Sequence, residues 1–245
     1  MAVTPSSSAE VMAVLTPRRR RGIEFLDDPA VEAQVAERSM RDIVRSNTLL
    51  GGTHAVVATV MRALRDEHLE QVSLLDVGTG LGDIPAHVRA RALRLGIAVR
   101  TIGLELNPVL ACRARSAALP VVRGSVLALP FRNGSVDIVT CSQVLHHFDA
   151  RDSRAVLREM NRVARRCVIV SDLRRSWVAA AGIWLVSFPL RFHPVSRHDG
   201  MTSVLRGFAG DELHDLVDSA VGASPRVRRR PGFRMTASWT PSHRA

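Results

Sequence analysis

The stretch that most constrains this chain is a buried strand followed directly by a glycine-rich turn and a helix. The apolar run over residues 72–77 is typical of a strand buried in a parallel sheet. Gly78, Gly80 and Gly82 follow at alternate positions, and from about Asp83 apolar residues recur at helical spacing. Glycines let a backbone approach a ligand closely, and a helix N-terminus offers free N–H groups. The stretch therefore predicts the start of a nucleotide-binding α/β unit.

The chain then alternates between strand and helix patterns, which favours a parallel sheet with helices on both faces. Asn107 and Pro108 mark one of these helices, because they supply an N-cap and a proline at the first helical position. Two closing strands are expected near the end of the chain, around Pro231 and Gly232. We therefore predict an α/β fold with a doubly wound, mostly parallel, seven-stranded sheet. Further strands are expected at residues 99–104, 121–122, 136–141 and 167–170, with the closing pair near 227 and at 233–239.

The segments outside the sheet pattern divide the chain into three parts. Residues 1–22 are rich in small residues and end in a basic run, so we expect a mobile basic N-terminal segment. Residues 23–68 carry two helical patterns ahead of the first strand, so we expect a helical cap. Residues 69–245 form the core, with an insertion at about 174–205. Its apolar stretch at 177–190 is shorter than the ~20 residues that span a bilayer.

The net charge of +11 favours acidic partners, such as nucleic acid or an anionic membrane surface. All 34 basic residues are arginine, a bias that GC-rich coding also explains. Cys112, Cys141 and Cys167 lie far apart and lack metal-ligand spacing, which is typical of reduced thiols in the cytosol. Since the N-terminus has no apolar signal core, we expect a cytoplasmic protein, or one at the cytoplasmic face of a membrane.

Asp76, two residues before the glycine turn, completes the pattern D-x-G-x-G-x-G. This pattern resembles the first motif of the Rossmann-like (class I) methyltransferases that depend on S-adenosylmethionine (SAM). A dinucleotide fingerprint has the different spacing G-x-G-x-x-G. Residues 136–148, 159–163 and 168–172 are similar to the later motifs of the same family. The resemblance spans about residues 70–175 and implies SAM as the cofactor and methyl transfer as the activity.

Glu105 ends the second strand, where an acid in nucleotide-binding folds accepts hydrogen bonds from ribose hydroxyls. The resemblance adds the loop at residues 124–126, which meets the adenine. Ser125 stands where most relatives carry Asp, so the backbone N–H of Val126 is expected to contribute more. The SAM-binding residues that we expect are Asp76, Gly78, Thr79, Gly80, Gly82, Glu105, Leu106, Ser125, Val126 and Ser142.

Short motifs outside the core resemble methyltransferases encoded beside type III polyketide synthases. These motifs are residues 26–29, 197–200 and 203–206. The resemblance implies secondary metabolism and a small, apolar acceptor that is phenolic or derived from a polyketide. The apolar insertion is then expected to act as a substrate lid carrying Trp184 and Phe188. Arginines that flank the insertion allow peripheral contact with a membrane.

A phenolic acceptor needs a base near neutral pH, and histidine is the residue type that suits this role. We expect His147, after the fourth strand, or His198, in the insertion, to be the catalytic base. His146 is expected to orient the loop. Asp199 either orients His198 or starts a turn. No group of His, Asp or Glu has ligand spacing along the sequence, so we expect no metal site.

Three other function classes compete with a small-molecule methyltransferase. An RNA or protein methyltransferase is favoured only by the basic charge, and the Asn/Asp-Pro-Pro-aromatic motif of many base methyltransferases is absent after the fourth strand. A nicotinamide dehydrogenase would need the other glycine spacing. A non-catalytic SAM-binding module is the third alternative. We therefore expect a small-molecule partner and no nucleic acid.

Overall fold

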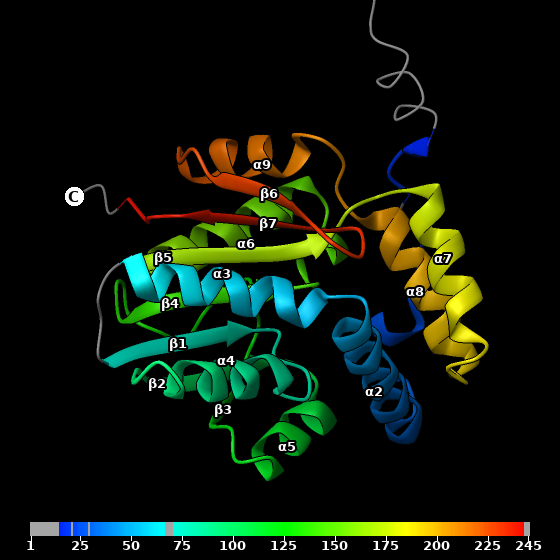
Figure 1. The fold of residues 1–245 in the computed structure, drawn as a ribbon, viewed down its shortest axis with the longest axis horizontal. Coiled ribbons are helices and arrows are strands. Elements are labelled where there is room, and N and C mark those ends of the chain that lie inside the picture. The colour runs from blue at the N-terminus through cyan, green and yellow to red at the C-terminus, as the bar shows by residue number, and fades with distance from the viewer. Residues whose placement is uncertain (1–14, 21, 29, 67–70, 243–245) are drawn as a thin grey trace, which may run out of the picture.

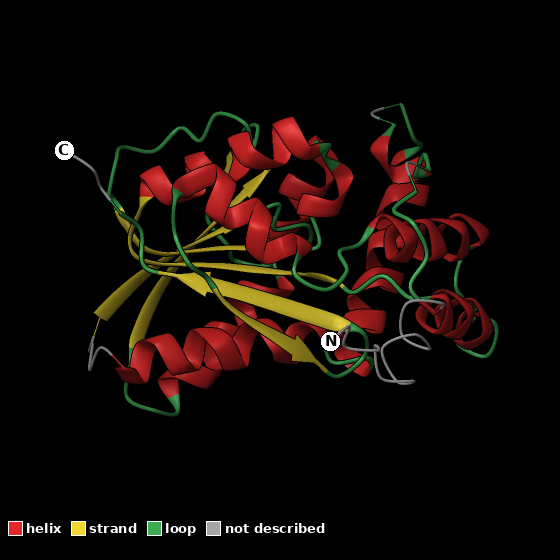
Figure 2. Cartoon of the chain, turned by 90° about the horizontal axis from the view of Figure 1, so that it is seen from above, coloured by secondary structure: helices red, strands yellow, loops and turns green. Residues whose placement is uncertain are grey.

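The computed structural model contains one seven-stranded sheet with helices on both faces (Figure 1, Figure 2). The strand order is β3-β2-β1-β4-β5-β7-β6; the first five strands are parallel, and β7 runs antiparallel to both β5 and β6. The predicted fold class and strand count are confirmed. The strands are β1 (Gln71–Val77), β2 (Ala98–Glu105), β3 (Val121–Arg123), β4 (Val136–Ser142), β5 (Ala164–Leu173), β6 (Arg226–Arg230) and β7 (Arg234–Trp239).

The structure describes residues 15–20, 22–28, 30–66 and 71–242. Most of the expected mobile segment, Arg21 of its basic run and Pro29 of the first flanking motif lie outside the described residues.

Helices cover both faces of the sheet. On one face α3 and α4 contribute Val60 and Val88, which pack against sheet residues such as Leu74. On the other face α6 and α9 contribute Leu157 and Leu213 to a second core cluster. The helices are η1 (Phe25–Asp27), α2 (Ala33–Leu49), α3 (Gly52–Asp66), α4 (Asp83–Leu93), α5 (Pro108–Ser116), η2 (Leu145–His147), α6 (Ala150–Val163), α7 (Trp177–Ser187), α8 (Pro194–Arg206) and α9 (Glu212–Val221).

A third group of helices, α2, α7 and α8, lies beyond the carboxyl ends of the parallel strands (Figure 1). We call this group the cap. The two helices expected as a cap over residues 23–68 are divided between layers: α2 belongs to the cap, whereas α3 packs on the sheet because its apolar face meets α4 and β5. The insertion expected at about 174–205 forms α7 and α8. Segments from both sides of the core therefore build the cap.

The described part of the N-terminal segment lies against the core. The backbone oxygen of Pro17 accepts a hydrogen bond of 2.6 Å from the buried guanidinium of Arg175. The N–H of Arg20 donates to the backbone oxygen of Leu205 at 3.2 Å. A buried guanidinium requires acceptors. This part of the segment is therefore fixed by hydrogen bonds, in contrast to the mobility expected from its composition.

Local sequence signals explain several of the element boundaries. The side chain of Asn107 accepts hydrogen bonds from the N–H groups of Val109 and Leu110, so the predicted N-cap of α5 is confirmed. Asp149 caps α6 by accepting from the N–H of Asp152. Among the described residues, no helix is both long and apolar enough to cross a membrane.

Candidate active site

The glycine turn leads from β1 into α4, and each of its glycines adopts the left-handed conformation. Gly78, Gly80 and Gly82 have φ angles of 69°, 56° and 78°. A Cβ atom on Gly78 would lie 2.5 Å from a neighbouring side-chain atom, so glycine is required there for space as well as for conformation. The N–H groups of Gly78 and Thr79 donate to the backbone oxygen of Leu104 at 2.9 and 3.0 Å. These bonds fix the turn against the end of β2.

Glu105 is buried at the end of β2 and links two backbone segments. Its Oε2 accepts a hydrogen bond of 2.9 Å from the N–H of Gly80, and its Oε1 accepts one of 2.9 Å from the N–H of Asn107. Burial raises the pKa of this carboxyl, and the backbone donors oppose the rise. Each carboxylate oxygen keeps a further lone pair, so Glu105 can also accept from ligand hydroxyls. The next side chain, Leu106, is 63% exposed and offers an apolar surface beside the carboxylate.

Asp76 lies beneath the turn and is fully enclosed. The hydroxyls of Thr79 and Thr140 donate to its two oxygens at 2.9 and 2.7 Å. Burial raises the pKa of Asp76 to about 7, against the effect of these two hydroxyls. Asp76 therefore ties the turn to β4 from behind. It was expected among the SAM-binding residues; because its oxygens accept from Thr79 and Thr140, a part in SAM binding stays a prediction and would be indirect.

The remaining groups around the turn fit SAM. Oδ2 of Asp83, in the first turn of α4, is buried and has no hydrogen-bond partner among the described residues. A buried acceptor without a donor is costly, and the ammonium group of a bound amino acid would satisfy it. Ser125 closes its own turn, since its hydroxyl oxygen accepts from the N–H of Leu127 at 3.2 Å. Val126 lies in that turn, and Ser142 is the last residue of β4, at the carboxyl ends of the parallel strands.

Three carboxylates and two histidines meet at the carboxyl ends of β4 and β5. Oδ1 of Asp172 lies 2.7 Å from Nδ1 of His146. Nε2 of His146 is buried without a hydrogen-bond partner among the described residues, 3.7 Å from Oε1 of Glu24. Nδ1 of His147 lies 2.7 Å from Oδ1 of Asp27, and the two imidazole rings are 4.2 Å apart between centroids.

Arg206, in the flanking motif at residues 203–206, binds Asp27 of the motif at residues 26–29 beside this cluster. Its Nη1 donates to Glu24 at 2.9 Å and to Asp27 at 2.7 Å, and its Nη2 donates to the backbone oxygen of His147 at 3.2 Å. Burial opposes ionisation of Asp27, but its bonds to His147 and Arg206 hold the pKa of this carboxyl well below its usual range. Segments that precede and follow the core are thus locked together beside the histidines.

The two histidines expected as bases have different surroundings. Burial opposes the charged form of His147, yet the hydrogen bond to Asp27 and the charge of Glu24 raise the pKa of its imidazole. His198 lies on α8 with half of its side chain exposed, and its Nδ1 is 3.0 Å from Asp199. Asp199 is buried and accepts the N–H groups of Phe25 and Leu26, so its main contact is with the start of η1.

Sequence reasoning missed several polar residues of this edge, among them the buried Arg234. Its guanidinium donates to the amide oxygens of Asn47 and Gln143 at 2.9 and 3.2 Å, and its Nε has no hydrogen-bond partner among the described residues. Burial lowers the pKa of Arg234 to about 10, while the charge of Asp172 opposes the drop. For Asp172 the sequence offered one signal of a functional residue, namely a polar side chain at the end of a predicted strand. For Glu24 and Asn47 the sequence offered no such signal.

Glu24, His146 and His147 offer three ligand atoms that lie within 4.8 Å of one another. The sequence showed no ligand spacing because these residues come from separate segments. Arg206 brings a positive charge to the same carboxylate. The three side chains already make ion pairs or hydrogen bonds with other residues of the fold. The expected absence of a metal site stays a prediction.

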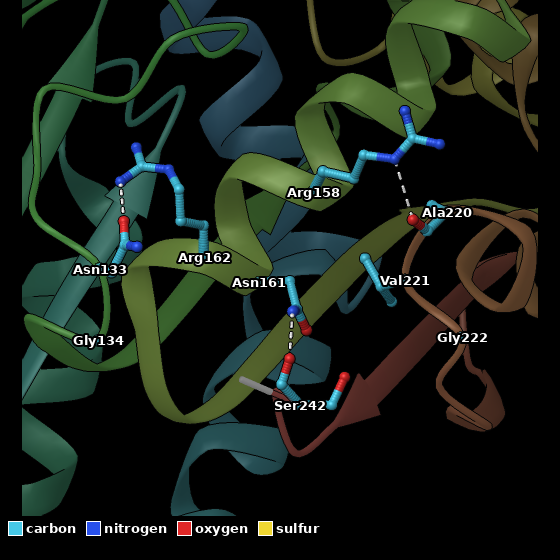
Figure 3. A pocket seen from close by; sticks show the side chains of 9 residues that line it. All are labelled: Asn133, Gly134, Arg158, Asn161, Arg162, Ala220, Val221, Gly222 and Ser242. Carbon is cyan, nitrogen blue, oxygen red and sulfur yellow. Dashed lines mark hydrogen bonds between the residues drawn. The ribbon is translucent and has the colours of Figure 1, made fainter. Parts of the chain in front are cut away.

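Trp184 and Phe188, expected in the lid, lie on the exposed side of α7 with their ring centroids 4.8 Å apart. A separate surface hollow of about 620 Å³ lies at the opposite edge of the sheet, between α6, α9 and the end of the chain (Figure 3). Its polar groups are bonded to one another: Arg162 donates to Asn133 at 2.8 Å, and Arg158 donates to the backbone oxygen of Ala220 at 3.1 Å. This hollow is a junction between elements, away from the glycine turn.

Comparisons of sequence identify the domain. Residues 75–169 match the profile of the family described as "Methyltransferase domain". An uncharacterized methyltransferase of Mycolicibacterium gilvum (strain PYR-GCK) is 30% identical over 171 residues, which are 68% of this chain and 58% of that protein. The chain therefore spans less than two thirds of the length of that relative.

Solved structures share the fold. A SAM-dependent methyltransferase from Aquifex aeolicus superposes with a TM-score of 0.55 at 14% identity, over 74% of this chain and 89% of that one. Magnesium protoporphyrin IX methyltransferase from Synechocystis PCC 6803 with bound SAH superposes with a TM-score of 0.54 at 16% identity, over 78% and 84%. The match over residues 75–169 and the relative indicate a methyltransferase domain, and the solved structures show that the chain shares the Rossmann-like fold of SAM-dependent methyltransferases.

Proposed function

We propose that this protein transfers a methyl group from SAM to a small apolar acceptor with a phenolic hydroxyl, such as a polyketide-derived aromatic. The observation that carries the methyl-transfer part is the Glu105 carboxylate, which bridges Gly80 and Asn107 beside the glycine turn. In nucleotide-binding folds a ligand lies at this edge, with its ribose on such an acid. Asp83 would accept the ammonium group, and Leu106 would lie against the base.

When bound, SAM would supply an electrophilic methyl group on a positively charged sulfur; a lone pair of the acceptor oxygen would take this methyl carbon while the carbon–sulfur bond breaks and the sulfur leaves as a neutral thioether. Within this chain, His146 has the geometry of a base. Asp172 holds its Nδ1, and its Nε2 makes no hydrogen bond among the described residues and lies 3.7 Å from Oε1 of Glu24. In catalytic Asp-His pairs the carboxylate fixes the tautomer and the far nitrogen takes the proton. The acceptor hydroxyl proton therefore passes to Nε2 of His146 as the oxygen–methyl bond forms.

His147 suits a different part in the same reaction. Since its pKa is raised, its imidazole is protonated more readily than usual near neutral pH, which favours donation of a hydrogen bond to a developing phenolate. His147 and His198 stay predictions as bases, and His146 is the stronger candidate. His198 is half exposed and contacts Asp199, which favours His146 over it as the base.

The proposed acceptor is apolar because the cap adjoins this cluster with an apolar helix. α7 begins shortly after Asp172 and contains no charged residue. It would act as the lid; Trp184 and Phe188 lie on its exposed side, so they would contact an apolar tail that extends out of the site along the outer surface of α7. The likeness of the flanking motifs to methyltransferases of polyketide pathways supports the same class of acceptor and a part in secondary metabolism.

Two measurements test the proposal together. Calorimetric titration should show that SAM binds and that NADH does not. Transfer of radiolabelled methyl groups should then label alkylresorcinol-type phenols and leave the label of RNA and protein at background. SAM binding without transfer to any fraction would support the non-catalytic module instead.

A second candidate, an RNA methyltransferase, is favoured by one observation. Arg226, Arg228 and Arg230 lie on one side of the edge strand β6 and line a hollow with Arg62 of α3. The charge of Arg62 lowers the pKa of Arg228, as expected for like charges held close together. This hollow lies beside α3, away from the glycine turn. Labelling of RNA that is lost in the double variant Arg226→Ala/Arg228→Ala would favour this candidate over the phenol.

A further inference from the structure

The helix α7 presents an apolar stripe to solvent. The exposed residues recur at spacings of three and four, which places them on one side of the helix. Leu185 is 60% exposed, and the two tryptophans are 42% exposed each. Monomeric soluble proteins rarely expose a contiguous apolar patch of this kind unless it binds something. The stripe consists of Trp177, Val178, Ala181, Trp184, Leu185 and Phe188.

The opposite side of α7 accounts for its packing within the fold. Ala179 and Ala180 are buried and cluster with Val204 and Leu205 of α8, and Ile183 is partly buried there. In Figure 1, α7 is the outermost helix of the cap, with α8 on its inner side. The fold therefore buries one side of the helix and leaves the stripe exposed. Such an exposed stripe indicates a binding partner.

Arginines stand at both ends of the stripe. The guanidinium of Arg20 lies 5.1 Å from the ring centroid of Trp177, and that of Arg197 lies 3.9 Å from the ring centroid of Phe188. Arg191 is exposed just beyond the C-terminus of the helix. Tryptophan, phenylalanine and leucine flanked by arginine are typical of helices that lie in the interface of a membrane, where anionic headgroups attract the charges.

From this arrangement we infer that α7 docks this protein on an anionic membrane surface. The helix lies in the plane of the interface, with the stripe at the boundary of headgroups and acyl chains. Its 11 residues extend roughly 16 Å, about half of a hydrocarbon core, so it lies on the bilayer and does not span it. A second copy fits the stripe poorly, because pairing two stripes would bring the arginines of two chains with a charge of +11 together.

Docking at this place has a consequence for the site, which rests on the proposed function. Asp172 and the first residue of α7, Trp177, are close in sequence at the same edge of the sheet. A membrane-bound α7 would therefore hold the histidine cluster near the bilayer. An acceptor with an acyl tail could then enter from the lipid phase. The docking itself requires no acceptor and no methyl transfer.

Vesicle flotation without acceptor tests the docking. We expect the full chain to float with vesicles of phosphatidylcholine and phosphatidylglycerol, and to remain in solution with phosphatidylcholine alone. Leu185→Glu should weaken binding to the anionic vesicles at least about tenfold, because it puts a charge in the part of the stripe that would enter the membrane. Arg197→Ala should weaken it less, and added salt should weaken it in the wild type.

Leu93→Glu is the matched control, because Leu93 is a leucine with 73% exposure on α4, away from the cap. It should bind vesicles as the wild type does. Unchanged SAM affinity in each variant would show that the fold is intact and would separate this test from that of the methyl-transfer proposal. Equal flotation of Leu185→Glu and the wild type would overturn the inference. A wild type that does not bind anionic vesicles would also overturn it. This includes the case in which the stripe forms a dimer interface that Leu185→Glu disrupts.

Discussion

Oδ1 of Asp172 lies 2.7 Å from Nδ1 of His146, and both side chains are buried at the carboxyl ends of neighbouring parallel strands. Burial opposes ionisation of Asp172, but the neighbouring His146 imidazole and the N–H of Leu173 keep the pKa of this carboxyl below its usual range. A second bond joins Asp172 to the backbone N–H of His146 at 3.1 Å. The carboxylate therefore fixes both the ring and the peptide of the histidine, which is the arrangement that a positioned base needs.

Asp172→Asn should lower kcat by about 10²–10⁴-fold with little change in the affinity for SAM, because the ring of His146 would lose its orientation and its tautomer. The pH profile of kcat should shift as well, which a purely structural part for Asp172 would not cause. The matched control is Asp215→Asn, which removes the carboxylate of an exposed Asp beside His214 on α9. Equal rates for the two variants would contradict a catalytic pair of Asp172 and His146.

Glu105→Ala should weaken SAM binding by about 1.5–3 kcal/mol, because it removes a charge-assisted acceptor and leaves the N–H groups of Gly80 and Asn107 without their partner. Glu105→Gln should cost less, since the amide keeps one acceptor oxygen. Titration calorimetry with SAM measures both. Wild-type affinity in the two variants would exclude Glu105 from the cofactor site.

The Asp76 carboxyl makes the stability of the protein depend on pH. Its pKa is raised from 3.8 to about 7 in the folded state, so the folded state binds this proton more tightly than the unfolded chain. Its contribution to stability is therefore fully present below about pH 3.8 and is lost as the pH rises towards 7. Asp76→Asn removes this contribution, so its free energy of unfolding should fall less over that range, by on the order of a few kcal/mol.

Urea unfolding at several pH values measures this difference between wild type and Asp76→Asn. The other titrating groups are common to both proteins, so the difference between the two curves isolates Asp76. Parallel curves between about pH 4 and 7 would show that Asp76 is charged in the folded state, contrary to its burial.

Methyl transfer should survive chelation with EDTA, although Glu24, His146 and His147 could together hold an ion. The guanidinium of Arg206 donates to the Glu24 carboxylate at 2.9 Å and would oppose a cation beside it. Elemental analysis of the purified protein and an assay in EDTA check this expectation. Activity lost in EDTA, restored by zinc or magnesium and absent from Glu24→Gln, would instead establish a metal centre.

Local pattern was sufficient to predict several elements of the sheet edge where we propose that SAM binds. The glycine turn, Glu105 and the N-cap of α5 each depend on neighbours in sequence, so their spacing determines their geometry. The alternation of strands and helices predicted the mostly parallel sheet, whereas the strand order is known from the structure. By contrast α3 was expected in the cap, because its apolar periodicity shows that one face is buried but does not show which surface it meets.

The acceptor side depends on contacts between distant segments, which periodicity does not report. His146 and Asp172 could have been paired from the rule that carboxyl ends of adjacent parallel strands meet. Glu24 comes from a segment without a repeating pattern, and only packing brings it to the histidines. The flanking motifs were noticed through a family resemblance, and the structure supplies a physical reason: Arg206 binds Asp27 across them.

The last prediction concerns the acceptor. If the acceptor is a phenol with an apolar tail that lies along the exposed side of α7, KM should fall as the alkyl chain of an alkylresorcinol series lengthens, because each buried methylene contributes about 0.8 kcal/mol. Truncating Trp184 and Phe188 to Ala should raise KM for the longer phenols, by a factor equivalent to about 1–3 kcal/mol of binding free energy for each lost aromatic contact. The affinity for SAM should stay unchanged. Steady-state kinetics without vesicles measures both effects and keeps them apart from membrane docking.

The shortest phenol of the series is the internal control for those variants, since it has no tail to reach the lid and should be methylated by the variants as by the wild type. Leu93→Ala controls for the loss of an exposed apolar side chain on another helix. A KM that is indifferent to chain length in the wild type would exclude a tail-binding lid. Preferential methylation of RNA would exclude the phenol as the acceptor as well. It would favour the arginines of β6 as the RNA-binding surface.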